Sequence, residues 1–86
     1  MRLDKFLKVS RLIKRRTVAK EFADNEKVTI NGRVAKPSSE VDKGDILVVQ
    51  LGARKLSVEV IDIRDNVRTS EASSLYRVLS EEPPRN

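Results

Sequence analysis

A run of basic residues near the start of the chain is the feature most able to do chemistry. Residues 11–17 read Arg-Leu-Ile-Lys-Arg-Arg-Thr, so four of the seven side chains are cationic. Asp4 is the only acid in the first twenty residues, so little relieves the repulsion among the cations. A solvated helical face would explain any single lysine here, but not the whole cluster. The cluster predicts a polyanion site and comprises Arg2, Lys5, Arg11, Lys14, Arg15, Arg16 and Lys20.

The most concentrated phosphate-binding point is expected at Arg15, Arg16 and Thr17. An arginine guanidinium can place two hydrogen bonds on one phosphate, which a lysine ammonium does not do. Thr17 is expected to cap a helix that starts directly after Arg16. The unpaired backbone N–H groups of that helix start would add to the anion site. Lys36, which lies farther along the chain, is a more distant member of the same set.

Catalytic, metal and membrane functions find little support in the residue types. The chain has no cysteine and no histidine, which removes thiol catalysis, zinc–cysteine sites and the commonest general base. The serines have no base to activate them, and the three glycines are too far apart for a phosphate-cradling loop. We therefore expect no enzyme activity, no metal and no cofactor. No apolar run approaches the roughly 20 residues that span a bilayer, so no membrane partner is expected.

Charge is distributed unevenly along the chain. Residues 1–36 contain 11 Lys/Arg and 4 Asp/Glu, whereas residues 37–86 contain 7 and 9. The whole net charge of +5 therefore comes from the first part. This asymmetry favours nucleic acid as the partner, with an acidic membrane second. The 86 residues are expected to form one domain, and the lack of cysteine suits a cytoplasmic location.

Two short helices are predicted to present the cations. Leu3, Phe6 and Leu7 share one face of a first helix, which should run from about Leu3 to Val9. A second helix, capped by Thr17, is predicted to end at Asp24, with Asn25 as a left-handed stop. Its predicted apolar face comprises Val18, Ala19, Phe22 and Ala23.

Strand patterns follow the helices. Val28 to Ile30 leads into Asn31-Gly32, a hairpin signal because both residues tolerate positive φ, and residues 33–35 would return. A two-residue turn would put Val34 opposite Thr29, and a longer loop is the alternative. Turns are predicted at residues 42–45 and 52–55, with a buried strand from 46 to 49 between them. A further strand begins at Leu56, with a bulge expected near Ile61-Asp62.

The last part of the chain has a mixed pattern. Ser70 is predicted to cap a helix with Ala72, Leu75, Tyr76 and Leu79 on one face, although residues 76–79 also fit a strand. Residues 81–86 are expected to form a tail. The whole pattern predicts an α+β fold, in which two short N-terminal helices pack on a small, twisted, mostly antiparallel sheet and a short C-terminal helix follows.

Structured RNA fits this pattern better than DNA or single strands. The second helix, of about two turns, is too short to act as an extended recognition helix. Two of the three aromatic residues, Phe6 and Phe22, fall on predicted core faces, so single-stranded bases would lack a stacking platform. Recognition should therefore rest on the RNA backbone and its shape.

Several short motifs follow one another in an order typical of one family. They are Arg2-Leu3-Asp4-Lys5-Phe6-Leu7, Ser10-Arg11, Arg15-Arg16-Thr17, Val28 to Gly32, Lys36-Pro37-Ser38 and Lys43-Gly44-Asp45. Over residues 1–48 this order resembles the S4-type RNA-binding domain. One departure is Asn25-Glu26, where many members carry glycine. The resemblance implies a core RNA-binding motif in residues 1–48, an added strand and C-terminal helix in residues 49–80, and an RNA face on the cations named above together with Thr17 and Lys36.

Within that family, the chain resembles small stand-alone members, among them the 15-kDa heat-shock protein and, more closely, members of bacterial ribosome quality control. This resemblance implies binding to stalled large ribosomal subunits that still carry peptidyl-tRNA. It implies contacts with large-subunit rRNA and the P-site tRNA while a partner, RqcH, adds a C-terminal alanine tail to the nascent chain. It also implies a non-catalytic cytoplasmic protein, monomeric in isolation.

Three other functions remain as alternatives. The chain could serve in ribosome assembly or as a small-subunit RNA-binding protein. It could be the detached RNA-binding appendage of an RNA-modifying enzyme such as a pseudouridine synthase, although 86 residues leave no room for a catalytic domain. A binder of acidic membranes or DNA is the third, but Leu3, Phe6 and Leu7 are needed for the core rather than for a membrane.

Overall fold

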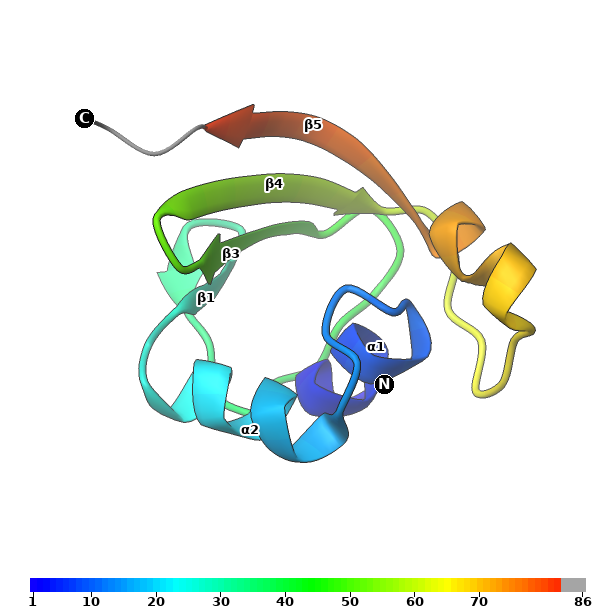
Figure 1. Ribbon diagram of the computed structural model, residues 1–86, viewed down its shortest axis with the longest axis horizontal. Helices are drawn as coiled ribbons and strands as arrows, with labels where there is room; N and C mark the ends of the chain where they lie inside the picture. Colours follow the sequence, from blue (N-terminus) through cyan, green and yellow to red (C-terminus); the bar gives the residue numbers. More distant parts are fainter. Residues whose placement is uncertain (83–86) are drawn as a thin grey trace.

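The first helix forms where its apolar spacing predicts. In the computed structural model, which describes residues 1–82, helix α1 occupies Leu3–Val9 (Figure 1). Leu3, Phe6 and Leu7 have no exposed surface, so the predicted face is the buried one. Burial of a side chain as large as that of Phe6 contributes about 1.5–3 kcal/mol relative to exposure. The short helix is therefore held by packing rather than by its own propensity.

Helix α2 occupies Arg16–Asp24, so it ends at Asp24 as predicted, but its start and the conformation of Asn25 differ from the prediction. Arg15 is the N-cap residue and no side chain caps the helix, so the prediction that Thr17 is the cap was wrong. Arg15 is already extended, with φ −119° and ψ 135°, and the helix therefore begins before Thr17 is reached. At the other end, Glu26 rather than Asn25 has the left-handed φ, of 60°. Asn25 instead donates its side-chain N–H to the Glu21 carbonyl at 2.8 Å.

The predicted apolar face of α2 is the one that packs. Ala19 and Ala23 are buried, and Val18 and Phe22 pack partly buried against the same core. Both α1 and α2 lie on one side of the sheet (Figure 1). The sheet contributes Leu47, Val49 and Val58 to the core, from strands at its centre. The helices are therefore backed by a rigid apolar surface.

Five antiparallel strands make up the sheet within the described residues. Their order is β2-β1-β3-β4-β5. The strands are β1 (Val28–Ile30), β2 (Arg33–Val34), β3 (Ile46–Leu51), β4 (Arg54–Val60) and β5 (Tyr76–Glu82). With the two helices and a 3-10 helix, η1 (Thr69–Leu75), this arrangement confirms the α+β fold class.

The hairpin between β1 and β2 uses the two-residue turn. Asn31 and Gly32 have φ values of 51° and 85°, and Thr29 pairs with Val34. The longer-loop alternative is therefore excluded. The Asn31 side chain accepts a hydrogen bond from the Ile46 N–H at 2.9 Å and donates one to Asp45 at 3.1 Å. The hairpin is thus fastened to the turn at residues 42–45, which forms as predicted.

The end of β4 and the segment after it depart from the prediction. β4 stops at Val60, so the bulge expected near Ile61-Asp62 was wrong; the irregularity lies where β4 pairs with β5, between Ser57 and Val58. Ser57 pairs with Ser80 and Val58 with Val78, which leaves Leu79 as the extra residue in β5. The turn before β4 is confined to residues 52–53, because Arg54 already pairs with Leu51.

The predicted C-terminal helix is shorter than expected. Ala72 and Leu75 are buried as predicted, but the 3-10 helix ends at Leu75, and β5 begins at the next residue. The strand alternative for residues 76–79 is correct, because β4 has a free edge whose backbone groups β5 satisfies. β5 continues to Glu82, so residues 81 and 82 belong to the sheet rather than to a tail. Residues 83–86 of the expected tail lie outside the described residues.

Candidate nucleic-acid interface

The junction between α1 and α2 is held from beneath by hydrogen bonds and apolar side chains. Buried Ser10 donates its hydroxyl to the Leu7 carbonyl at 3.2 Å, and the Ile13 N–H donates to the same carbonyl at 3.1 Å. Ile13 is buried and Leu12 is half-buried against the core. Arg11 takes a left-handed φ of 64°, which turns the chain outward after α1. The two aliphatic residues therefore fix the junction, and its cations are left exposed.

A single buried carboxylate joins two of the predicted arginines. Asp4 is 3% exposed and lies in the first turn of α1. The Arg2 guanidinium approaches both of its oxygens, with Nε 3.2 Å from Oδ1 and Nη2 3.3 Å from Oδ2. Arg16 Nη2, at the start of α2, lies 3.5 Å from Oδ1. Both arginine side chains remain about half exposed, so each can still meet an anion.

The organising role of Asp4 was missed by the sequence reasoning. Asp4 also accepts the Lys5 backbone N–H at 2.8 Å. A signal was available, because Asp4 is the only acid among the cations of the first twenty residues. A buried charge must be paired, and a lone acid in a basic segment is the natural partner.

Lys5 lies at the edge of the cluster and is already engaged. Its ammonium Nζ donates to Asp65 Oδ1 at 3.0 Å, which links α1 to the segment between β4 and η1. This hydrogen bond and the positive charge of Lys5 lower the pKa of the Asp65 carboxyl. Lys5 would therefore have to exchange a carboxylate for a phosphate in order to bind RNA.

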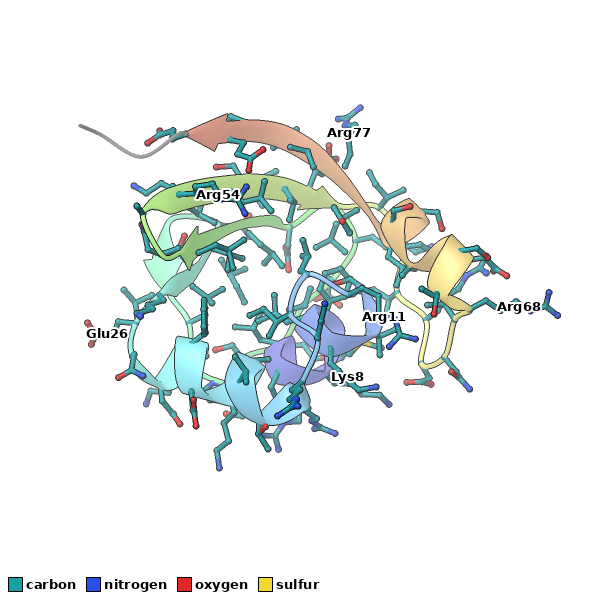
Figure 2. All side chains as sticks on the ribbon, viewed as in Figure 1. Lys8, Arg11, Glu26, Arg54, Arg68 and Arg77 are labelled. Atoms are coloured by element: carbon teal, nitrogen blue, oxygen red, sulfur yellow. The ribbon has the colours of Figure 1, made fainter. Side chains whose placement is uncertain are left out.

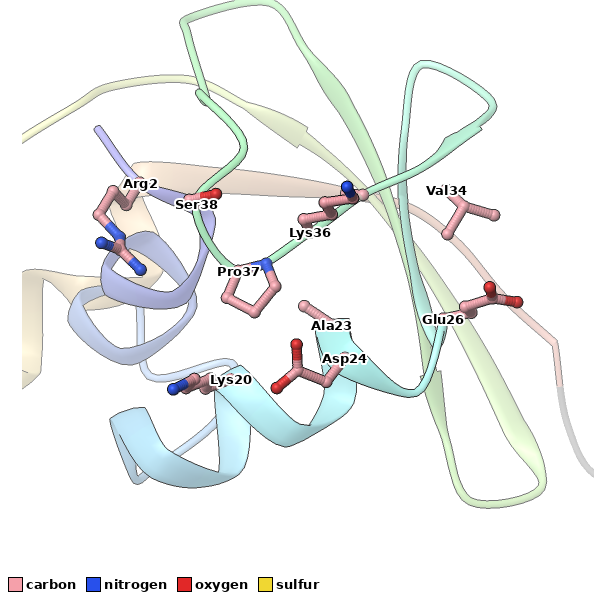
Figure 3. A pocket seen from close by; sticks show the side chains of 10 residues that line it. Arg2, Lys20, Ala23, Asp24, Glu26, Val34, Lys36, Pro37 and Ser38 are labelled. Atoms are coloured by element: carbon pink, nitrogen blue, oxygen red, sulfur yellow. The ribbon is translucent and has the colours of Figure 1, made fainter.

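Lys36 is brought to the cluster by tertiary structure. It borders a groove of about 640 Å³ together with Arg2 and Lys20, although the three come from separate segments (Figure 3). Backbone hydrogen bonds hold the Lys36 segment against α1: the Asp4 N–H donates to the Pro37 carbonyl at 3.1 Å, and the Leu3 N–H to the Ser39 carbonyl at 2.8 Å. Lys36 therefore borders the same groove as Arg2 and Lys20, although it lies farther along the chain.

Several cations late in the chain have acidic partners, whereas five cations of the predicted set do not. In the second half, Arg54 pairs with Glu81, Arg77 with Glu59, and both Lys43 and Arg64 with Asp62. The bonds from Arg64 and Lys43 lower the pKa of Asp62. Among residues 1–82, by contrast, no ion pair engages the side chains of Arg11, Lys14, Arg15, Lys20 or Lys36. Five of the eight cations in the predicted set therefore keep a positive charge that no carboxylate in the described residues neutralises.

Two further residues complete the junction. Exposed Thr17 lies in the uncapped first turn of α2, where backbone N–H groups lack partners within the helix. Lys8, which the prediction left out, lies one turn before the junction, and its carbonyl accepts the Arg11 N–H at 3.1 Å; both side chains are labelled in Figure 2. Lys8 therefore adjoins the predicted set of cations. Its place near the end of α1 could have indicated this from the sequence.

Metal-ligand clusters and membrane-spanning helices are both absent from residues 1–82. Residues 1–82 contain no group of three or more side chains able to hold a metal ion. Over the same range, no helix combines the length and the apolar character that a bilayer crossing requires.

Comparison with known proteins assigns this arrangement to a family. A family model described as the S4 domain matches residues 1–47, which contain both helices, the junction and the β1–β2 hairpin. The chain belongs to the S4 domain family. The resemblance inferred from the sequence motifs is thereby confirmed, and the Asp4-centred pair of arginines lies inside the S4 domain.

Known relatives of this S4 protein extend over nearly the whole chain. The RQC P-site tRNA stabilizing factor of Halalkalibacterium halodurans is 54% identical over 83 residues, which is 96% of this chain and 94% of the relative. The factor of the same name from Bacillus subtilis is also 54% identical, over 95% of each chain. Among solved structures, trimeric heat shock protein 15 of Vibrio cholerae is 34% identical, with a TM-score of 0.86 over 93% of this chain and 82% of that one.

Proposed function

We propose that this protein is a non-catalytic RNA-binding factor of ribosome quality control. It would bind large ribosomal subunits that still carry peptidyl-tRNA after a stall, and contact both the rRNA and the P-site tRNA. The observation that carries the proposal is the unpaired cationic junction inside an S4 domain, in a chain 54% identical to P-site tRNA stabilizing factors over nearly its full length.

The RNA face would consist of the junction and its immediate surroundings. Arg11, Lys14 and Arg15 project from the segment that Leu12 and Ile13 fix to the core. Arg2 and Arg16 would present guanidinium groups pre-oriented by Asp4, which reduces the entropy lost when they bind phosphate. Lys20 and Lys36 would extend the face toward the groove, and Lys5 and Thr17 would complete it.

Binding alone can perform the proposed task. A factor that binds one position of the tRNA more tightly than its alternatives shifts the population toward that position, by as much as the difference in binding free energy. Phosphates of rRNA and tRNA that meet at one surface provide such a difference. We propose that this holds the tRNA in the P site while a partner, RqcH, adds alanines to the nascent chain.

The organisation of the chain fits this role. We propose that residues 1–48 form the RNA-binding core, and that the strands β4 and β5 with η1 form an added layer that supports it. The same proposal places the protein in the cytoplasm, where ribosomes are, and treats it as a monomer when free of the ribosome.

Sedimentation tests the proposal directly. The tagged full-length protein is expressed in cells with stalled ribosomes, and gradient fractions are assayed for the protein, for subunits and for tRNA. We expect the protein to sediment with large subunits and to co-purify with tRNA and large-subunit rRNA. Sedimentation with small subunits, or with assembly intermediates that lack tRNA, would instead favour the alternative of a ribosome-assembly or small-subunit protein.

A further inference from the structure

The groove beside the RNA-binding cations has a lining that phosphate contacts do not explain. It lies between the end of α2, the β1–β2 hairpin and residues 36–38 (Figure 3). Its volume of about 640 Å³ falls within the roughly 300–1,000 Å³ of small-molecule sites. Arg2, Lys20 and Lys36 account for its cationic margin. The remaining lining is mostly apolar and acidic, a combination suited to more than a phosphate.

The apolar part of the groove is a preformed floor. Ala23 lines it from α2, Ala35 and Pro37 line it from the stretch after β2, and all three are buried. The Pro37 carbonyl is held by the Asp4 N–H at 3.1 Å, so the proline ring is anchored to α1. Val34, at the margin, is 58% exposed, more than any other large hydrophobic residue among those described. A flat apolar ligand resting on this floor would remove Val34 from water.

An acid stands beside the apolar floor with no partner of its own. Asp24 ends α2, and Figure 3 shows its carboxylate directed toward Pro37. Within residues 1–82, the Asp24 carboxylate makes neither a hydrogen bond nor an ion pair, although Lys20 lies one helical turn before it. A carboxylate only accepts hydrogen bonds, so it would select a ligand that presents N–H groups at its edge.

We propose that this groove holds one unpaired nucleobase of the bound RNA, and that it prefers bases with an exocyclic amino group. The inference rests on the proposed RNA-binding function and adds base recognition to it. The base lies on the Pro37 floor, its amino group donates to Asp24, and its flanking phosphates meet Arg2, Lys20 and Lys36. An unpaired base that leaves the stack can pack against apolar side chains. Proteins recognise RNA sequence mainly at such unpaired bases in loops and bulges.

The proposal predicts a definite order of bases. Adenine, cytosine and guanine each carry an exocyclic amino group, whereas uracil has only a ring N–H set between two carbonyl oxygens, which a carboxylate repels. Full-length protein is titrated with fluorescent RNA hairpins that are identical except for one bulged nucleotide, with a fully paired hairpin as reference. We expect bulged A, C or G to bind about tenfold more tightly than bulged U, the scale of one charge-assisted hydrogen bond.

A matched pair of variants isolates the carboxylate. Asp24→Asn replaces it by an amide that donates as well as accepts, so the preference over U should vanish or reverse. Asp42→Asn makes the same change of charge in the exposed 42–45 turn and should leave the preference intact. In the wild type, the methyl NMR signals of Ala23 and Val34 should shift with the bulged-C hairpin and not with the paired one.

The outcomes separate this proposal from the function on which it rests. Equal binding of all the hairpins, bulged or paired, would overturn the base site and leave RNA binding standing. A base preference that survives Asp24→Asn, or methyl signals that do not move, would also overturn it. Failure to bind any hairpin, even at low salt, would overturn the base site and RNA binding together.

Discussion

Asp4 determines how the guanidinium groups of Arg2 and Arg16 are presented at the surface. Its carboxylate is buried, yet it reaches guanidinium groups on both α1's N-cap and the start of α2. An arginine held in this way keeps its outer N–H groups for an anion while its inner ones are already paired. The same contact neutralises part of the repulsion between Arg2 and Arg16. Asp4 therefore sets both the position and the spacing of two guanidinium groups that could donate hydrogen bonds to phosphate.

Replacement of Arg16 by alanine should weaken RNA binding without unfolding the protein. The Arg16 side chain is about half exposed and its nearest carboxylate oxygen lies 3.5 Å away, so the stability change should stay within about 0.5 kcal/mol. The loss of one charge-assisted phosphate contact should weaken ribosome association about tenfold. Both quantities can be measured, by thermal melting and by co-sedimentation with large subunits.

Arg68→Ala is the matched control for this change, because Arg68 is an exposed arginine before η1, outside the proposed face (Figure 2). It should leave association unchanged. If Arg16→Ala lowered the melting temperature strongly while ribosome binding persisted, Arg16 would be a structural residue instead.

At the scale of elements, the segment between β4 and η1 is fastened to the helices by charge. Lys5 on α1 pairs with Asp65 in that segment, and Asp62 binds Arg64 and Lys43. These contacts join the added C-terminal layer to the S4 domain at its surface. Both aspartates have a lowered pKa because of their basic partners, so the fastening depends on pH.

The Asp65 contact should stabilise the fold only where the carboxylate is charged. A pKa lowered by folding contributes stability above the unfolded value of roughly 3.9, and this is lost as the pH falls through the lowered folded pKa. Asp65→Asn should therefore lower the melting temperature slightly near neutral pH and have no effect in strong acid. Melting curves from neutral pH down to about pH 2 measure the difference.

Lys5→Met provides the reference background for this experiment. In that background the Asp65→Asn effect should disappear at every pH, because the carboxylate has lost the partner that lowers its pKa. An undiminished effect in the Lys5→Met protein would show that Asp65 acts through another contact.

At the scale of the whole molecule, positive charge is distributed unevenly between the first part of the chain and the rest. The first 36 residues carry the excess of cations, and later in the chain Lys43, Arg54, Arg64 and Arg77 pair with acids. One end of the protein is therefore strongly attractive to polyanions, and the other is close to balanced. Such a distribution would orient the molecule as it approaches a polyanion.

Salt should weaken RNA binding to an extent that counts the phosphates contacted. If the five cations of the proposed face that have no ion pair within residues 1–82 each neutralise one phosphate, the logarithmic plot of affinity against salt should have a slope of about −3.5 to −4.5. These cations are Arg11, Lys14, Arg15, Lys20 and Lys36. Fluorescence titrations of one RNA at several salt concentrations give the slope, and a flat dependence would refute the electrostatic account.

Much of the S4 domain could be predicted from local patterns. The apolar spacing of Leu3, Phe6 and Leu7 determined α1, and Asn31-Gly32 determined the hairpin, because each signal is complete within a few residues. Helix ends were harder to place. The start of α2 depended on how the junction packs, and Thr17 looks like a cap only when that packing is ignored.

The sequence by itself determined the family, the fold class and the segment where positive charge gathers. Composition and short-range periodicity suffice for these, since neither depends on which distant residues meet. Tertiary structure alone decided that Asp4 would bind Arg16, that Lys36 would join Arg2 and Lys20 at one groove, and that residues 76–82 would become a strand. Each of these depends on contacts between segments far apart in the chain, where burial and pairing override local preference.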